Sequence, residues 1–509
     1  MDKRFGRARI NAITTLSYQV VSMLSGFLIP WLLIDVFGSE IYGATTSIAQ
    51  LLTYIALFEG GIGRVARGAL YEPLASKKED EISGIYLAIK KFFFILGMVF
   101  LGYAIILAIF YYDISGISVF TRWYTFALVL SIAVGKFAEY MGGISNITLF
   151  NADQRLYVVN LVNILSTILN VICVIILSSA GVDILWVKLV SSFVFILKPI
   201  IFTLYLKTHY NIKKSKSHRV LKNKITGIAQ HTAYVVQNNT DILILTIFSD
   251  LKYVAVYSIY HLVCFSLRNI TTSFTGGMEA VFGDMVAKKE QELLKKTYYR
   301  YKFILTFLSL TFFGTAGALI VSFVALYTSG TTDVNYIQPI FALILLLGEA
   351  LNCIILPCFN LPIAANQLKN CQWGAYVEAL INLLISFALV LWNPLIGVAL
   401  GTLISVIFKS VYYIVYSGKN ILNVKVGFLI KNFFITVVSL FFICFIGMIV
   451  FSHIEILNYF MWIISGFCTI IIVSIFSILV CKMLYPGVVK EYINSAIRKI
   501  RIARNSYVK

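Results

Sequence analysis

Apolar stretches of roughly 20 or more residues recur along the whole chain, and they restrict the possible fold more than any other feature. As a helix, each stretch is long enough to cross a hydrocarbon core of about 30 Å. Of the 509 residues, 59% are hydrophobic and only 13% are charged, which is too apolar for a soluble surface. The sequence therefore predicts an all-α, polytopic membrane protein with about 14 transmembrane helices. The predicted spans cover residues 12–36, 41–70, 84–111, 123–151, 156–179, 184–206, 225–249, 253–284, 301–328, 337–364, 371–392, 394–417, 427–451 and 457–484.

The net charge of +19 would suit a nucleic-acid-binding protein only if the basic residues formed one patch. They do not, because 33 of the 42 Lys and Arg residues fall on the predicted cytoplasmic side, at the two termini, on alternate inter-span segments and in the adjoining ends of the spans. This is the distribution of the positive-inside rule, with both termini in the cytoplasm and an even number of spans. The distribution of Lys and Arg therefore indicates the membrane topology, and no nucleic-acid partner is expected.

The chain contains an internal repeat. A shift of 211 residues places Tyr42 on Tyr253 and Lys198 on Lys409, and a shift of 213 places residues 152–154 on 365–367. Six spans return the chain to its starting side, so the copies share one orientation and form two pseudo-symmetric six-helix lobes plus a C-terminal helix pair. The predicted parts are an N-terminal lobe (1–206), a basic cytoplasmic linker (207–224), a C-terminal lobe (225–417), the helix pair (418–484) and a basic amphipathic cytoplasmic tail (485–509).

No pattern of residues indicates an enzyme. The eight cysteines lie in or beside apolar spans without a CxxC pair, the five histidines lack metal-ligand spacing, and no nucleotide-binding loop is present. We therefore expect no catalytic residue, no metal and no cofactor, although H⁺ or Na⁺ coupling stays open through Glu59, His231 or His261. Glu59 beside two glycines could instead mark a helix break. A membrane-embedded glycosyltransferase or polymerase would need catalytic carboxylates on a sizeable external loop, which the short loops do not offer.

Charged side chains inside the spans are the best candidates for a binding site, because each costs about 2.5–3.5 kcal/mol at a span's centre unless it faces protein or water. Arg268 lies halfway along the eighth span. It either faces a cavity or forms a structural ion pair with Glu279 or Glu349. Lys136 and Glu139 lie at i, i+3 on the fourth span and could neutralise each other.

Polar residues gather on two further spans. The tenth carries Glu349 and Asn352 at i, i+3. The seventh carries a run that suits either a wet cavity wall or helix-to-helix hydrogen bonding, made of Gln230, His231, Gln237, Asn238, Asn239 and Asp241. Arg64 and Arg67 either snorkel or line an electropositive vestibule, and Lys198 and Lys409 are expected to snorkel. The predicted cavity residues are Arg268, Lys136, Arg64, Arg67, Glu139, Gln237, Asn238, Asp241, Glu349 and Asn352.

Several motifs together suggest a family. The fourteen-span plan, the duplication, the glycine-rich second span with Arg64, the Asn151-Ala-Asp-Gln-Arg155 end of span four and the Ala365-Asn-Gln367 end of span ten resemble the multidrug, oligosaccharidyl-lipid and polysaccharide (MOP) exporter superfamily. Within it, the chain is similar to O-antigen (Wzx-type) and polysaccharide flippases. The resemblance implies a central cavity lined by spans one, two, four, seven, eight and ten.

The resemblance also implies a function. A polyprenyl-diphosphate-linked oligosaccharide would move from the cytoplasmic to the outer leaflet of a bacterial cytoplasmic membrane by alternating access. Polysaccharide polymerase machinery and membrane lipid are the partners that this role implies. A peptidoglycan lipid-precursor flippase and a cation-coupled multidrug exporter of the same superfamily are the alternatives.

Overall fold

The computed structural model of the protein describes residues 2–59, 62–213, 228–273 and 277–491, except the side chains of residues 2–5, 8, 64, 228–234, 237 and 238. Every regular element in these ranges is helical, and twelve of the helices are long and apolar enough to cross a membrane. Two more, α9 (Ile228–Phe248) and α10 (Leu251–Ser273), occupy the seventh and eighth predicted spans. The predicted all-α, multi-pass membrane fold is confirmed.

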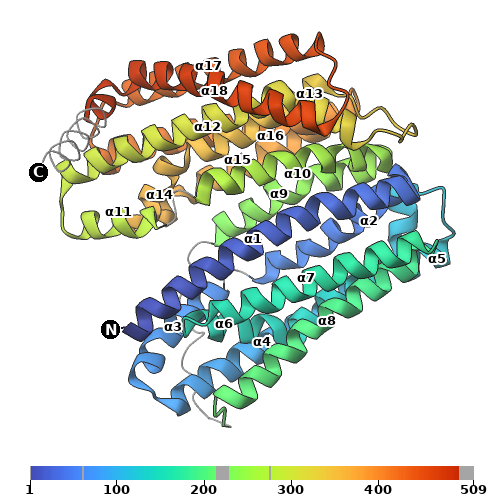
Figure 1. Cartoon of the computed structure of the whole chain (residues 1–509). Coiled ribbons are helices and arrows are strands. Elements are labelled where there is room, and N and C mark those ends of the chain that lie inside the picture. The colour runs from blue at the N-terminus through green and yellow to red at the C-terminus, as the bar shows by residue number, and fades with distance from the viewer. Residues whose placement is uncertain (1, 60–61, 214–227, 274–276, 492–509) are drawn as a thin grey trace, which may run out of the picture. The chain divides into compact units, whose positions relative to one another are not determined.

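The first half of the chain forms the helices shown from blue to green in Figure 1. Their bounds are α1 (Asp2–Phe37), α2 (Ser39–Leu52), η1 (Thr53–Glu59), α3 (Ile62–Ser76), α4 (Glu79–Ser115), α5 (Arg122–Ala138), η2 (Glu139–Gly143), α6 (Ile144–Ala152), α7 (Leu156–Ser179) and α8 (Ile184–His209). The labels η1 and η2 denote a 3₁₀ segment and a π turn.

After α9 and α10, the second half continues through shorter and longer helices. These are α11 (Met278–Ala287), α12 (Gln291–Tyr327), α13 (Pro339–Ile354), α14 (Leu356–Ala364), η3 (Leu368–Cys371), α15 (Gln372–Val390), α16 (Pro394–Ser417), η4 (Gly418–Leu422), α17 (Val426–Ser452) and α18 (Tyr459–Leu484).

Two predicted spans are interrupted rather than continuous. The second, predicted over 41–70, stops as an α-helix at Leu52, tightens into η1 and resumes as α3 at Ile62. The hydroxyl of Thr53 donates to the carbonyl of Gln50 at 2.6 Å, at the point where the α-helix gives way to η1. The eighth, predicted over 253–284, is likewise divided into α10 and α11. Apolar length alone does not reveal such breaks, because hydropathy continues across them.

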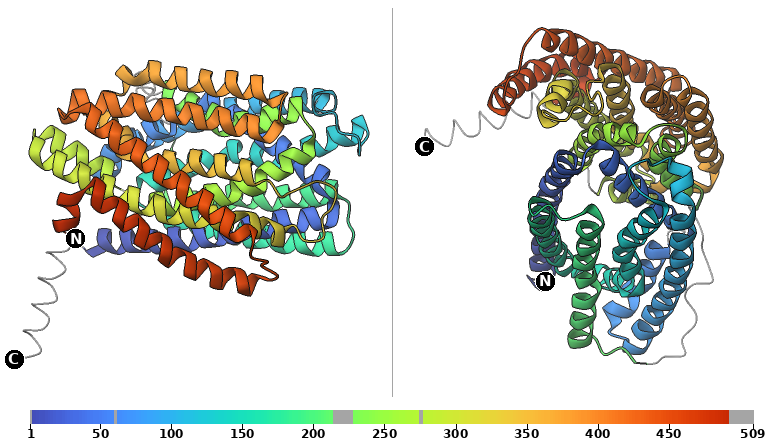
Figure 2. Two further views of the ribbon diagram at one scale, coloured as in Figure 1. Left: turned by 90° about the horizontal axis from the view of Figure 1, so that it is seen from above. Right: turned by 90° about the vertical axis from the view of Figure 1, so that its right-hand side faces the viewer.

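The chain divides into two compact units. Unit 1 comprises residues 1–258 and 330–334, and unit 2 comprises residues 259–329 and 335–509. In unit 1, α1 packs along α7, α5 packs along α8, and α9 packs against α2 and η1. The long helices of this unit run side by side, as Figure 2 also shows. Its core includes Phe93, Phe100 and Phe150, all at most 2% exposed.

In unit 2, α12 packs against α13, α17 and α18, and α15 packs along α16. The α15 and α16 helices approach closely because Gly397 and Gly401 face the α15 backbone, where an added Cβ would lie 2.5 Å from the Leu389 carbonyl carbon and 2.0 Å from the Ser386 hydroxyl. Small residues four apart are a common means of bringing membrane helices together. Separately, the C-terminal helices α17 and α18 both pack against α12 of unit 2.

The internal duplication is visible in the helix geometry. The α4 and α12 helices each contain 37 residues, and their first residues are 212 positions apart. The left-handed residues before them, Lys77 and Lys289, and those at the ends of spans four and ten, Gln154 and Asn366, are also 212 apart. Equal lengths and equal turn conformations at one shift confirm two copies of one helical plan. The lobe boundaries at residues 206 and 225 stay predictions.

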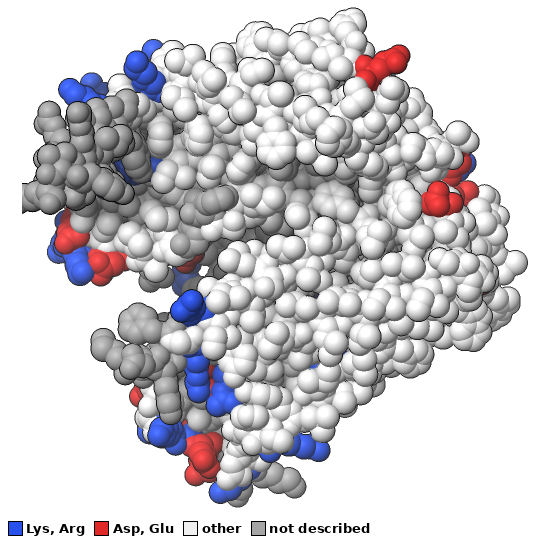
Figure 3. Space-filling view, in the orientation of Figure 1, with Lys and Arg blue, Asp and Glu red and all other residues white. Residues whose placement is uncertain are grey.

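Charged residues avoid the sides of the helices. On the face of the molecule that Figure 3 shows, the sides of the helices are almost entirely uncharged, and Lys and Arg gather near helix ends. The exposed side chains between these ends are large and apolar, such as Phe94, Ile106 and Phe110 on α4. A soluble protein rarely exposes so much apolar surface, whereas lipid-facing helices must.

Candidate intramembrane binding site

A cavity of about 600 Å³ lies inside unit 1, between α1, α5, α7 and α8. Polar side chains line it although these helices are largely apolar. The polar uncharged lining residues include Tyr18, Ser22, Ser25, Thr167, Asn170, Ser191 and Ser192. The charged lining residues are Lys136, Glu139, Lys188 and Lys198. Three ammonium groups and one carboxylate therefore face this space among the described lining residues.

Lys136 and Glu139 form an ion pair on the cavity wall. The Lys136 Nζ lies 3.1 Å from the Glu139 Oε2, and both side chains are about a third exposed, at 38% and 30%. The π turn η2 begins at Glu139 and follows α5 directly. The ion pair that the i, i+3 spacing predicted is therefore present. The role of Lys136 and Glu139 in binding the substrate remains a prediction.

Lys188 and Lys198 add positive charge without an ion-pair partner among the described residues. The Lys198 ammonium lies 4.6 Å from the centre of the Phe195 ring, a cation–π distance. We expected Lys198 to snorkel to the cytoplasmic surface, but it lies near the middle of α8 and lines the cavity. The span boundary predicted at residue 206 had placed it nearer the helix end. Lys188 was not singled out, although a lysine in an apolar run with no acid within one turn was a usable signal.

In unit 2, Arg268 on α10 forms an ion pair with Glu349 on α13. The Arg268 Nη1 donates to the Glu349 Oε2 at 2.8 Å, and the carboxylate side chain is only 6% exposed. The His261 Nε2 lies 4.0 Å from the other oxygen of the same carboxylate. Of the two acids considered for Arg268, Glu349 is the partner, while Glu279 is exposed on α11. Asn352 follows one turn later on α13 and is half-buried.

Two further buried cations in unit 2 have structural partners. The Lys409 Nζ lies 3.1 Å from the Glu378 Oε1, and their side chains are 15% and 5% exposed. The expectation that Lys409 snorkels is therefore wrong. Lys302, at the start of the predicted span 301–328, is buried and donates to the carbonyl of Ile354 at the end of α13, at 3.1 Å. Each partner lies on another helix, so local spacing could not reveal it.

The described part of the polar run on α9 makes helix-to-helix hydrogen bonds. The carboxylate of Asp241 accepts from the Tyr257 hydroxyl at 2.8 Å, and the amide oxygen of Asn239 accepts from Thr53 at 2.7 Å and from Gln50. This is the structural alternative that the sequence had left open for these two residues. The side chains of His231, Gln237, Asn238 and Arg64 lie outside the described part of the structure.

Glu59 lies at the end of η1, where its carboxylate accepts a hydrogen bond from the Tyr140 hydroxyl at 2.5 Å. The residue thus marks an interruption of the second span and is also tied to the fourth. Its predicted part in coupling remains a prediction, as does that of His261. Arg67 is half-buried on α3, which packs against α4 and α6.

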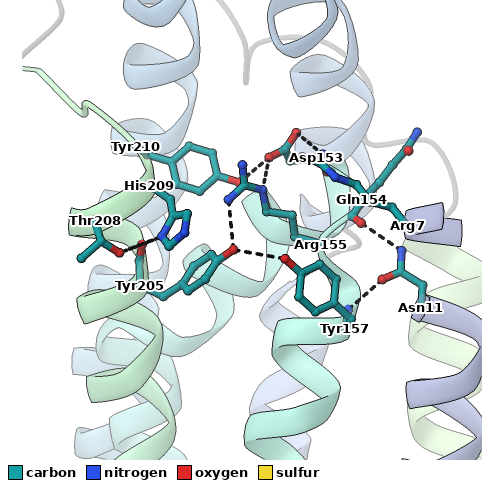
Figure 4. Close-up of polar contacts among 10 residues, drawn as sticks. All are labelled: Arg7, Asn11, Asp153, Gln154, Arg155, Tyr157, Tyr205, Thr208, His209 and Tyr210. Atoms are coloured by element: carbon teal, nitrogen blue, oxygen red, sulfur yellow. Dashed lines mark hydrogen bonds and ion pairs between the residues drawn. The ribbon is translucent and has the colours of Figure 1, made fainter. Parts of the chain in front are cut away.

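The motif at the end of span four, residues 151–155, takes part in a cluster of hydrogen bonds and ion pairs that we call the latch, drawn in Figure 4. The Arg155 Nε lies 2.7 Å from the Asp153 Oδ2, and Arg155 also donates to the Tyr205 hydroxyl of α8 at 3.0 Å. The Tyr210 hydroxyl donates to the same carboxylate at 2.6 Å. Burial, together with this hydrogen bond to Asp153, raises the pKa of Tyr210 above its ordinary value. Tyr210 is therefore a neutral donor at physiological pH.

The latch reaches α1 as well. Asn11 donates to the Gln154 carbonyl at 3.0 Å and accepts from the Tyr157 backbone N–H at 2.8 Å, as Figure 4 shows. In the second repeat, the hydroxyl of Tyr416 donates to Gln367 at 3.0 Å. These two residues lie 211 and 212 positions after Tyr205 and Arg155. The motif thus holds helices together in both copies.

Comparison with known proteins identifies the fold. No family model matches the chain, and no curated protein matches it in sequence. Among solved structures, the lipid II flippase MurJ in an inward closed conformation aligns with a TM-score of 0.68 and 16% identity over 94% of this chain and 99% of MurJ. The MATE multidrug transporter DinF-BH in complex with R6G aligns with a TM-score of 0.58 and 14% identity over 82% of this chain and 97% of that one.

An inward-facing MATE family transporter of the MOP superfamily aligns with a TM-score of 0.55 and 14% identity over 79% of this chain and 97% of that one. The alignments extend over 97% or more of each of these three proteins. The chain therefore has the fold of MurJ and of these MATE transporters.

Proposed function

We propose that this protein is a flippase for a polyprenyl-diphosphate-linked oligosaccharide, an O-antigen or other surface polysaccharide unit. The observation that carries the proposal is the cavity in unit 1, where Lys136, Lys188 and Lys198 face a space with a single carboxylate, that of Glu139. Uncompensated positive charge inside apolar helices is costly, so it is retained where a negative group meets it. An anionic cargo supplies that group.

The chemistry of such a cargo matches the polar lining. A diphosphate and its sugars pay a prohibitive cost for entering hydrocarbon unaided, whereas the polyprenyl tail is at home in lipid. Ammonium and guanidinium groups make charge-assisted hydrogen bonds to phosphate oxygens. The hydroxyl and amide groups of Ser22, Ser25 and Asn170 suit sugar hydroxyls. The protein need shelter only the headgroup.

The cavity also bears on the alternatives. A multidrug exporter that carries cations would place acids where this chain has three lysines, so the charge balance disfavours it. A peptidoglycan lipid-precursor flippase uses the same headgroup chemistry, and the similarity to the lipid II flippase MurJ over 94% of the chain supports keeping it as the second candidate. The two candidates differ in the glycan and not in the diphosphate.

The remaining parts of the proposal follow from a flippase role. Translocation proceeds by alternating access from the cytoplasmic to the outer leaflet of the bacterial cytoplasmic membrane, with both termini cytoplasmic. Protonation of Glu59, His231 or His261, or Na⁺ binding, couples transport to an ion gradient. A polysaccharide polymerase then receives the cargo.

A reconstituted system tests this proposal. The purified full-length protein is placed in liposomes with a fluorescent polyprenyl-diphosphate oligosaccharide, and an external sugar-modifying enzyme reports the fraction that reaches each leaflet. The proposal predicts protein-dependent exchange between leaflets. Efflux of a cationic dye under an ion gradient, without exchange of the lipid, would move the protein to the multidrug class. Faster exchange of lipid II than of oligosaccharide units would favour the second candidate.

A further inference from the structure

We propose that Lys188 and Lys198 form a phosphate-binding subsite in the cavity of unit 1, which takes the diphosphate of the lipid-linked cargo. This inference rests on the proposed function for the identity of the cargo, and it names the residues that would recognise its charge.

The α7 and α8 pair corresponds to the α15 and α16 pair. In the first repeat, Ser191 donates to the amide oxygen of Asn170 at 2.5 Å. In the second, the amide of Asn382 donates to the hydroxyl of Thr402 at 2.9 Å. The asparagines are 212 residues apart and the hydroxyl residues 211 apart, so the same polar contact joins the same two helices in both copies. This contact sets the register for the comparison.

In that register, one lysine is common to both copies. Lys198 corresponds to Lys409 at a shift of 211 residues. Lys409 has a buried acid 3.1 Å away, Glu378, which lies four residues before Asn382. The first repeat has Ser166 four residues before Asn170, and the Ser166 side chain is buried. The second copy thus neutralises its lysine, and the first copy lacks the acid that would do so.

The first repeat also has an additional lysine. Lys188 corresponds to Ala399, again at a shift of 211 residues. Ala399 is 1% exposed and packs in the core of unit 2, whereas Lys188 faces the cavity of unit 1. Relative to the second copy, the first copy therefore carries one more lysine within the predicted spans, Lys188, and one fewer acid on the same pair of helices. If the lysines of the first copy served only packing, that copy would need neither the additional lysine nor the loss of the acid.

The cavity suits an anion with several acceptor oxygens. Two ammonium groups offer up to six N–H donors, and the hydroxyls of Ser191 and Ser192 line the same cavity on the stretch of α8 between the two lysines. A phosphate ester or diphosphate can accept from several donors at once, which a halide cannot do with directional bonds. The same chemistry belongs to the cargo's diphosphate and to the phosphate of an anionic phospholipid, so the test must distinguish these sources.

Equilibrium binding of geranyl diphosphate, a soluble short-chain probe, tests the subsite. The full-length protein is placed in nanodiscs of phosphatidylcholine alone, and the Kd is measured by titration calorimetry, with geraniol as the uncharged control. We expect Lys188→Met with Lys198→Met to weaken binding roughly ten- to hundredfold, the range for losing hydrogen bonds to charged groups. Lys207→Met, an exposed lysine in the last turn of α8, should change the Kd by less than about twofold.

Several results would overturn the inference. Binding of geranyl diphosphate by the double variant with the wild-type Kd would remove the subsite, and equal affinity for geraniol would show that charge plays no part. Lys188→Arg with Lys198→Arg keeps both charges, so recovery of binding in this variant separates lost charge from a folding defect. Displacement of the probe by phosphatidylglycerol in the nanodisc would assign the subsite to phospholipid rather than to the cargo.

The subsite and the flippase role fail in different ways. Lysine-dependent binding of geranyl diphosphate, together with no leaflet exchange of the lipid-linked oligosaccharide, would leave the subsite standing and contradict the proposed cargo. Leaflet exchange that is unchanged in the double lysine variant would support the flippase role and contradict the subsite.

Discussion

Arg268 and Glu349 hold each other at 2.8 Å across α10 and α13, with the carboxylate nearly out of contact with solvent. Removing one partner of such a pair leaves a buried charge and typically costs about 3–5 kcal/mol, whereas replacing both often costs little. A transport defect in a single variant therefore does not by itself assign a role in binding to Arg268.

A double substitution separates structure from binding. We expect Arg268→Gln to lower the apparent Tm, because Glu349 loses its partner, and Arg268→Gln with Glu349→Gln to recover most of the Tm. If Arg268 contacts the headgroup, the stable double variant still fails to exchange lipid-linked oligosaccharide between leaflets. Thermal unfolding in detergent and the leaflet assay measure the two effects. Wild-type exchange by the double variant would make the ion pair purely structural.

Lys409 and Lys198, which occupy equivalent positions in the two repeats, should respond differently to replacement by Met. Lys409→Met leaves the buried Glu378 without its ion-pair partner and should destabilise the protein by about 3 kcal/mol. Lys198→Met removes a cation that has no ion-pair partner among the described residues, so stability should change by no more than about 1 kcal/mol. Thermal unfolding of the two variants provides the comparison. Equal losses of stability would mean that Lys198 is structural too.

Gly43 permits the close approach of α2 to the start of α10. A Cβ at this position would lie 1.9 Å from the carbonyl oxygen of Leu251, which is backbone and cannot rotate away. We expect Gly43→Ala to destabilise the protein by at least about 1–3 kcal/mol. In α4, Gly102 has nothing within 4 Å of an added Cβ, so Gly102→Ala should be neutral or stabilising by about 0.5–1 kcal/mol. A tolerated Gly43→Ala would contradict this packing.

The latch around Arg155 should matter more than an exposed ion pair. We expect Arg155→Ala to destabilise the protein by about 2 kcal/mol, because Asp153 and Tyr205 both lose a partner in a partly buried site. Arg122, which pairs with Asp113 at the surface, is the matched control, and its replacement by Ala should cost less than about 1 kcal/mol. Chemical denaturation of both variants measures the difference, and a larger effect at Arg122 would overturn the assignment.

The segment after α18 should detach in acid. Hydrogen bonds from Arg300 and then Lys296 hold the pKa of Glu491 below its ordinary value of 4.5. A lowered folded-state pKa means that this attachment is fully present above pH 4.5 and is lost as the pH falls through the lowered pKa. The protection factors of residues 486–491, which compare the measured exchange with the intrinsic rate at each pH, should therefore fall in acid. Glu491→Gln should have low protection factors already at neutral pH, and wild-type protection factors that stay the same from neutral pH to acid would contradict this.

Hydropathy and repeats were sufficient to predict the fold class. The apolar runs located α4, α7, α8 and α17 to within a few residues at most ends, because lipid demands long apolar helices. Hydropathy missed the break after Leu52 and the left-handed Gly277 that precedes α11, because backbone interruptions leave it unchanged. The sequence also shows cations inside the apolar spans, where a charged side chain is costly unless it faces protein or water.

The partners of those cations could not be read from one sequence. Glu378 and Ser166 occupy equivalent positions, yet only a structure shows that one faces a lysine and that Lys188 lines a cavity. The i, i+3 pair of Lys136 and Glu139 was accessible to sequence reasoning because both residues lie on one helix face. Contacts between helices depend on rotation and crossing angle, which local spacing does not specify.

Comparing two lipids that differ only in the presence of the diphosphate tests the flippase proposal most directly. Liposomes containing the wild-type protein receive either a fluorescent oligosaccharide on a polyprenyl diphosphate or the same oligosaccharide joined to the polyprenol without phosphate, and leaflet exchange of each is followed with an external sugar-modifying enzyme. We expect rapid exchange of the diphosphate form and little exchange of the neutral form, because the cationic cavity recognises the headgroup. Equal exchange of both lipids, or exchange of neither, would contradict it.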